Sequence, residues 1–143
     1  MSPGRLDSEL VRRHLLALDR ALTNLQHHRG RPRAALDTLD EAWLVERGLL
    51  LCAQNALDIA THLAASAGRD APDYASAIDA LAELGVLSRD FCTRFRGVAG
   101  FRNVLVHGYL SVDLDRVHRL INDQLDDFAT FAGLVQAHLD RQQ

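Results

Sequence analysis

Lysine is absent from this chain of 143 residues, and all 16 basic residues are arginine. Because the exclusion is complete, we attribute it to the coding bias of a genome and give it no functional meaning. The chain also lacks the uninterrupted apolar run of about 18 residues that would indicate a membrane-spanning helix. Residues 1–7 lack the apolar stretch of a secretory signal. We therefore expect a cytoplasmic protein that has no membrane partner.

Cysteine is scarce, with only Cys52 and Cys92 in the chain, and in the cytoplasm both are expected to be free, buried thiols. No segment alternates between polar and apolar residues as a strand would, and there is neither an internal repeat nor a low-complexity tract. Hydrophobic residues make up 48% and charged residues 24%, which is typical of a globular protein. The length suits one domain that spans residues 1–143.

Apolar residues recur with helical periodicity along the chain, which predicts an all-α fold, an antiparallel up-and-down bundle of four to five helices. The second helix is the most apolar and should lie at the centre. Gly48 inside it indicates either that another backbone passes close or that the helix bends. Trp43, Phe128 and Phe131 are expected in the core or in a dimer interface. The predicted helices run from about Leu6 to Gly30, from Leu36 or Asp37 to Ala67 with Gly68 as the stop, from an N-cap at Asp73 to just before Gly85, from an N-cap at Ser88 through at least Ala99, and from Ser111 or Asp113 to about Leu139.

The segment from Gly100 to Tyr109 places three chemically capable side chains close together in the sequence. Arg102 offers a planar, permanently charged fork for phosphate oxygens. His107 can transfer a proton near neutral pH, and Tyr109 presents a hydroxyl that can be modified. An isolated set of this kind is more often structural than catalytic, so the set needs support from its surroundings.

The charge distribution gives part of that support. Residues 91–112 contain Arg94, Arg96 and Arg102 and no acidic residue, although the net charge of the chain is −3. These arginines are predicted to form a local anion site, which suits recognition of one phosphate region rather than a long duplex. The alternative is that a short acid-free window arose by chance.

The pattern of Arg, four residues, His, one residue and Tyr resembles the signature of the HEPN superfamily, specifically the HepT-like toxin ribonucleases that are encoded beside a minimal nucleotidyltransferase antitoxin. Arg102, Asn103, His107 and Tyr109 match it, whereas Gly108 departs from it, because this position is often charged in the family. The similarity extends over residues 5–138 and includes segments 46–49, 55–60 and 81–87.

This resemblance implies a HEPN-like homodimer that acts as a metal-independent RNA endonuclease and as the toxin of a toxin–antitoxin pair. It implies that Arg102 and His107 are catalytic, and that a partner nucleotidyltransferase attaches AMP to Tyr109. Asn103, Arg96 and Arg94 are expected to support catalysis or bind RNA, and no cofactor or metal is expected. The main alternative is a non-catalytic helical dimer that binds a nucleotidyltransferase or a nucleotide.

The spacing raises a geometric problem, because five residues rotate by roughly 140° on a regular helix. Arg102 and His107 would then lie on different faces. Either the helix ends within residues 104–108 and Gly108 swings the later side chains round, or motifs from two subunits of a two-fold dimer line one cleft. Glu46 and Asp58 are weak candidates for pairing with Arg102. Metal binding by His27 and His28, or by Asp113, Asp115 and His118, is not expected, because their spacings are unlike those of dependable sites.

Overall fold

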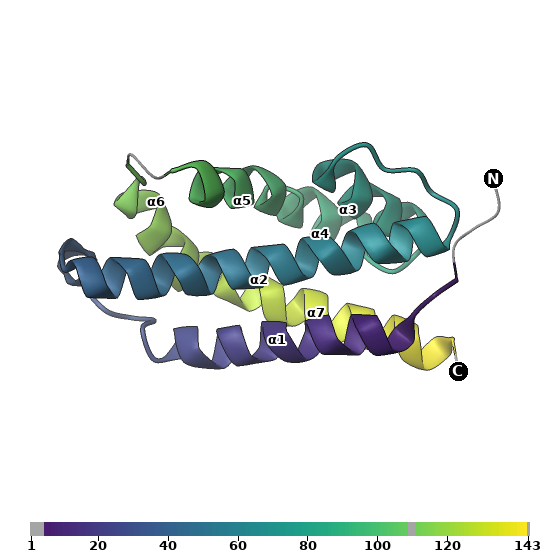
Figure 1. The fold of residues 1–143 in the computed structure, drawn as a ribbon, viewed down its shortest axis with the longest axis horizontal. Coiled ribbons are helices and arrows are strands. Elements are labelled where there is room, and N and C mark those ends of the chain that lie inside the picture. Colours follow the sequence, from purple (N-terminus) through teal and green to yellow (C-terminus); the bar gives the residue numbers. More distant parts are fainter. Residues whose placement is uncertain (1–4, 109–110, 143) are drawn as a thin grey trace.

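The computed structural model describes residues 5–108 and 111–142, and within these residues the only regular secondary structure is helical (Figure 1). The prediction of an all-α fold is therefore confirmed. None of the helices formed by these residues is long and apolar enough to cross a membrane. The elements are α1 (Ser8–Gln26), the 3₁₀ turn η1 (Arg33–Asp37), α2 (Leu39–Ser66), α3 (Tyr74–Glu83), α4 (Arg89–Phe95), α5 (Val98–His107), α6 (Leu114–Arg119), the π-helical segment η2 (Leu120–Gln124) and α7 (Leu125–Arg141).

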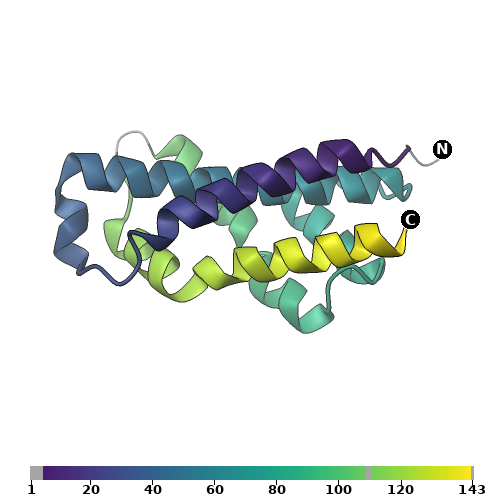
Figure 2. The ribbon, with the colours of Figure 1, turned by 90° about the horizontal axis from the view of Figure 1, so that it is seen from below.

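Helix α2 is the central element of an up-and-down bundle. Figure 1 shows it between α5 and α1, both of which run antiparallel to it. Turned by 90°, the view in Figure 2 shows α1 and α7 side by side, and these two helices are in contact. Eleven residues of α2 are buried, including Leu49, Cys52 and Leu57. This helix therefore contributes to the core along its whole length, as its apolar stripes predict.

Local rules set most helix ends. The carboxylate of Asp73 accepts a hydrogen bond from the backbone N–H of Ser76 at 2.7 Å, and the hydroxyl of Ser88 accepts one from that of Phe91 at 3.1 Å. Both predicted N-caps are confirmed. Gly30, Gly68 and Gly85 have φ angles of 83°, 79° and 78°, a conformation that favours glycine just beyond a helix.

The space beside Gly48 explains the glycine in the central helix. A Cβ atom at this position would lie 2.6 Å from Cδ2 of Leu25 in α1. A neighbouring side chain therefore occupies the space, rather than the neighbouring backbone that the sequence suggested. Cys52 and Cys92 are free and buried, as expected, and burial raises the pKa of the Cys52 thiol to about 12.

Three predictions about the elements were wrong in detail. The second helix begins at Leu39, because residues 33–37 form a separate 3₁₀ turn, and the fifth predicted helix is interrupted by η2. The fourth predicted helix is broken at residues 96–97. This break lets α4 stack Phe95 on Phe131 of α7, with ring centroids 4.9 Å apart, while α5 packs along α2. Phe128 and Phe131 are buried in the core, but the side chain of Trp43 is 63% exposed.

Candidate functional site

Arg102 is held in place by two neutral side chains. It lies on α5, where it is half-buried, and its Nε donates a hydrogen bond to Oε1 of Gln54 on α2 at 2.8 Å. Its Nη1 donates to Oδ1 of Asn103 at 3.0 Å, and its guanidinium carbon lies 5.4 Å from the ring centroid of Tyr74. In the part of the chain that the structure describes, Arg102 forms no ion pair with a carboxylate. The guanidinium is therefore oriented without being neutralised by direct contact.

Gln54 connects Arg102 to a second layer of polar groups. Its Nε2 donates to Oδ1 of Asp58 at 2.8 Å and approaches the hydroxyl of Tyr74 at 3.2 Å. Only one orientation of the amide satisfies both neighbours, because arginine can only donate and an ionised carboxylate can only accept. Asp58 therefore fixes which atom Gln54 presents to Arg102. The direct pair between Arg102 and Asp58 is not formed, because Gln54 stands between them.

His107 is the last residue of α5, and its side chain is exposed. The helix therefore runs through both Arg102 and His107, which leaves them about 140° apart around its axis. The predicted helix end within residues 104–108 is confirmed, but the prediction that this end swings His107 round to Arg102 is wrong, because His107 is still helical. Gly108 has an ordinary φ of −84°, but a Cβ there would lie 2.6 Å from the carbonyl oxygen of Val104. Close approach, and not a left-handed conformation, accounts for this glycine.

A groove of about 590 Å³ opens between α5 and the start of α3, and Tyr74, Gly100 and Asn103 are among its lining residues. Gly100, Asn103 and His107 are spaced by three and four residues, so they follow one exposed stripe along α5. The exposed stripe that borders the groove at Gly100 and Asn103 therefore continues to His107.

Arg94 and Arg96 differ from Arg102 because both have carboxylate partners. Nε and Nη2 of Arg96 each lie 3.0 Å from an oxygen of Asp79 on α3. This guanidinium holds the pKa of the Asp79 carboxyl below its usual range. Nε of Arg94 lies 3.2 Å from Oδ1 of Asp127 on α7. The acid-free window in the sequence is thus neutralised at two of its three arginines by acids from other helices.

The remaining candidate residues do not contact the Arg102 network, or lie outside the described residues. Glu46 is half-buried, burial raises the pKa of its carboxyl, and it forms no ion pair within the described residues, so the suggested pair with Arg102 is not formed. Tyr109 lies outside the described residues. His28 contacts Glu41 at 2.7 Å, and His118 contacts the carbonyl oxygen of Arg31 at 3.1 Å. Residues 5–108 and 111–142 contain no group of three or more His, Cys, Asp or Glu side chains arranged to hold a metal ion.

Sequence comparison relates most of the chain to one protein family. Residues 18–135 match the family described as ribonuclease HepT-like. A curated relative, the mRNA nuclease HepT of Shewanella oneidensis, is 25% identical over 87 residues, which is 60% of this chain. The match covers 65% of the length of that relative.

Solved structures share the fold over nearly the whole chain. The tri-AMPylated HEPN toxin of Shewanella oneidensis, solved in complex with the MNT antitoxin, superposes with a TM-score of 0.79 at 20% identity and covers 90% of this chain and 97% of that one. The cytosolic protein of unknown function YutE from Bacillus subtilis gives a TM-score of 0.84 at 17% identity, with 96% and 93% covered. The HEPN-like fold class is therefore confirmed.

Proposed function

Because the chain belongs to the HepT-like ribonuclease family, we propose that it is a metal-independent RNA endonuclease and the toxin of a toxin–antitoxin pair. The observation that carries the proposal is the environment of Arg102. Its guanidinium is oriented by the amides of Gln54 and Asn103, so its charge remains available to a phosphate. An arginine with only a structural role is expected to pair with a carboxylate, which neutralises its charge, as Asp79 does for Arg96.

The proposed chemistry assigns one role to each side chain. Cleavage of RNA by its own 2′-hydroxyl removes a proton from that hydroxyl, forms a bond from its oxygen to phosphorus, and breaks the bond to the 5′-oxygen, which takes up a proton. His107 transfers protons, an effect typically worth about 10²–10⁴-fold. Arg102 stabilises the extra negative charge on the five-coordinate phosphorus from a preorganised position. Asn103 orients Arg102, and its NH₂ group remains available to a phosphate oxygen.

A homodimer would bring Arg102 of one copy close to His107 of the other, whereas the two residues lie on different faces of a single α5. Large apolar side chains are exposed on the N-terminal half of α2, among them Leu39 at 59% and Trp43 at 63%. Trp43 and Gln54 are eleven residues apart, about three turns, so they project from the same side of the helix. A second copy that covers these apolar residues would approach the Arg102 network from that side. In this arrangement, His107 of one copy faces Arg102 of the other.

The relatives support a proposal that a minimal nucleotidyltransferase regulates this chain. The similar toxin from Shewanella oneidensis is described as tri-AMPylated and in complex with an MNT antitoxin. We place the corresponding modification on the hydroxyl of Tyr109, two residues after His107. Negatively charged AMP groups there would obstruct the cleft and repel RNA. The cytoplasm remains the expected location.

The enzymatic proposal is tested by incubating the purified protein with total RNA in EDTA. The wild type should cleave RNA, whereas His107→Ala and Arg102→Ala should cleave it far more slowly. Arg20→Ala, an exposed arginine on α1, serves as the matched control and should cleave normally. Equal residual cleavage by all four proteins would contradict the proposal and favour the non-catalytic dimer.

The regulatory proposal is tested in cells. Expression should arrest growth, and a co-expressed minimal nucleotidyltransferase should relieve the arrest and add AMP-sized mass to the protein. Tyr109→Phe should remain toxic in the presence of the antitoxin. Relief of toxicity without any gain in mass would indicate that the antitoxin acts only by binding.

A further inference from the structure

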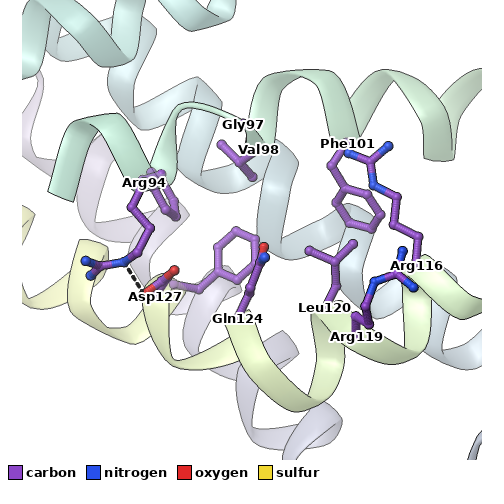
Figure 3. Close-up of a pocket in the computed structure, with 11 residues that line it drawn as sticks. Arg94, Gly97, Val98, Phe101, Arg116, Arg119, Leu120, Gln124 and Asp127 are labelled. Atoms are coloured by element: carbon purple, nitrogen blue, oxygen red, sulfur yellow. Dashed lines mark hydrogen bonds and ion pairs between the residues drawn. The ribbon is translucent and has the colours of Figure 1, made fainter. Parts of the chain in front are cut away.

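A second cavity, with a basic lining, lies on the other side of α5 from the Arg102 network. It has a volume of about 300 Å³ and is enclosed by α4 and α5 on one side and by α6, η2 and the start of α7 on the other (Figure 3). Phe101 faces this cavity, whereas the next residue, Arg102, contacts α2. Three arginines and three phenylalanines line it: Arg94, Arg116, Arg119, Phe95, Phe101 and Phe128. We refer to it as the Arg116 cavity.

The charges around the Arg116 cavity do not cancel. Arg94 is paired with Asp127, the one acidic residue in the lining (Figure 3). Arg116 and Arg119 form no ion pair with any carboxylate of the described residues. Of the acids that lie close in sequence, Asp113 caps α6 and Asp115 is paired with Arg33. Asp123, four residues after Arg119, forms an ion pair with neither Arg116 nor Arg119. Two positive charges therefore remain for an anion.

Arg116 is also oriented in advance. Its guanidinium carbon lies 5.5 Å from the ring centroid of Phe101, and the side chain is half-buried. Stacking on an aromatic ring restricts a guanidinium without using its hydrogen-bond donors. Leu120 and Gln124, which begin and end the π-helical segment, line the same cavity. Segments of this kind occur often at functional sites, and the amide of Gln124 adds a further donor.

We propose that the Arg116 cavity binds a phosphate group of the RNA chain at a position away from the scissile bond. The inference rests on the proposed ribonuclease function and extends it to a second contact. His107 is six residues beyond Phe101, about 9 Å along the axis of α5. The two residues are also about 120° apart around that axis. A single strand that wraps across α5 can therefore reach both places. The cavity positions the strand, and it takes no part in the bond-breaking step.

The sharpest test adds charge without removing a contact. Gly97 lines the cavity, has an ordinary backbone conformation with φ of −62°, and has open space around a built Cβ. Gly97→Glu therefore places a carboxylate at the cavity without strain. Gly133→Glu is the matched control, because Gly133 lies in α7 with the same open surroundings. Gly97→Ala controls for the loss of glycine.

Binding is measured by fluorescence anisotropy with a short single-stranded RNA, at several salt concentrations, in a His107→Ala background that prevents cleavage. Gly97→Glu should weaken binding by at least about three-fold relative to Gly133→Glu, while Gly97→Ala should bind like its parent. Arg116→Gln should lower the slope of log affinity against log salt by roughly 0.7, the change expected for one lost phosphate contact on a single strand. Arg20→Gln should leave the slope unchanged.

The outcomes separate this inference from the proposed function. If the parent binds RNA and the wild type cleaves it, but Gly97→Glu matches Gly133→Glu, the cavity proposal is overturned and the nuclease stands. If the wild type cleaves RNA but the parent does not bind it, the cavity proposal alone is overturned. If the wild type does not cleave RNA and the parent does not bind it, both are overturned. If Gly97→Glu loses only its complex with the nucleotidyltransferase and binds RNA normally, the cavity belongs to a protein interface and the proposal is again overturned. Circular dichroism shows whether each variant is folded. If Arg116→Gln does not fold, the result for Gly97→Glu alone tests whether the Arg116 cavity binds RNA.

Discussion

Arg96 and Arg102 lie six residues apart and have opposite environments. Arg96 is exposed, and both of its bonds go to the carboxylate of Asp79. Arg102 is half-buried and bonds to the neutral amides of Gln54 and Asn103. A carboxylate partner fixes a guanidinium and cancels its charge, whereas an amide partner fixes it and leaves the charge in place. The difference teaches that the partner of an arginine, rather than its presence in a basic window, indicates a phosphate site.

The largest effect expected from this comparison is on catalysis. Arg102→Ala should lower the rate of RNA cleavage by about 10²–10³-fold, the range typical for loss of one preorganised group that stabilises developing charge. Arg96→Ala should change the rate by less than about three-fold, because its charge is already neutralised. Single-turnover cleavage assays measure both. Similar losses in the two variants would mean that the whole basic window acts together.

The next largest effect concerns the proposed dimer, in which Arg102 meets His107 of the second copy. Trp43→Asp should raise the dimer dissociation constant by about 30-fold or more, since a buried interface tryptophan commonly contributes about 2 kcal/mol. The monomer should remain folded, because this side chain is 63% exposed. Sedimentation velocity gives the dissociation constant. Leu16→Asp on α1, where the side chain is 52% exposed, is the control and should leave the dimer intact.

A charge swap tests whether a neutral partner matters for Arg102. In the double variant Gln54→Glu/Asp58→Asn, a carboxylate accepts from Arg102 while the new amide at position 58 donates to it, so the hydrogen bonds and net charge are preserved. RNA affinity should fall about ten-fold, equivalent to about 1.4 kcal/mol, with an unchanged melting temperature. Asp58→Asn alone keeps a neutral acceptor next to Arg102 and should bind normally. Tight binding by the double variant would contradict the importance of the neutral partner.

The smallest expected effect is on the reactivity of Cys92, which lies close to the Arg96–Asp79 pair. Burial and the neighbouring Asp79 raise the pKa of Cys92, and Arg96 partly offsets this rise. Arg96→Gln should therefore raise the Cys92 pKa further and slow its alkylation by iodoacetamide at alkaline pH, since only the thiolate reacts. Mass spectrometry quantifies this cysteine separately from Cys52. Arg102→Gln should not change the rate, and an equal slowing there would show that the two arginines are not electrostatically separate.

The sequence was sufficient for features that depend on nearby residues. The caps at Asp73 and Ser88 and the stops at Gly30, Gly68 and Gly85 are confirmed, because such signals act within one turn of the chain. The apolar stripes of residues 39–66 likewise identified the central helix.

Features that depend on distant residues were missed. Arg96 is neutralised by Asp79, and Arg94 by Asp127, which counting charges in a window does not detect. Gln54 lies 48 residues from Arg102. The only signal for it was that Gln54 and Asp58 lie one turn apart on the polar face of this helix, together with Thr61 and His62. Their relation to Arg102 is set by the packing of α5 on α2, which has no local signature.

The central claim is that Arg102 and His107 meet across two copies of the chain, and mixing subunits tests it most directly. Arg102→Ala and His107→Ala homodimers are each inactive by this account. Dissociated and reassociated together in EDTA, they should form mixed dimers that regain a substantial part of wild-type RNA cleavage, because one cleft then contains both intact groups. If mixed dimers form, as differently tagged subunits would reveal, and cleavage does not return, the two residues do not act across the interface.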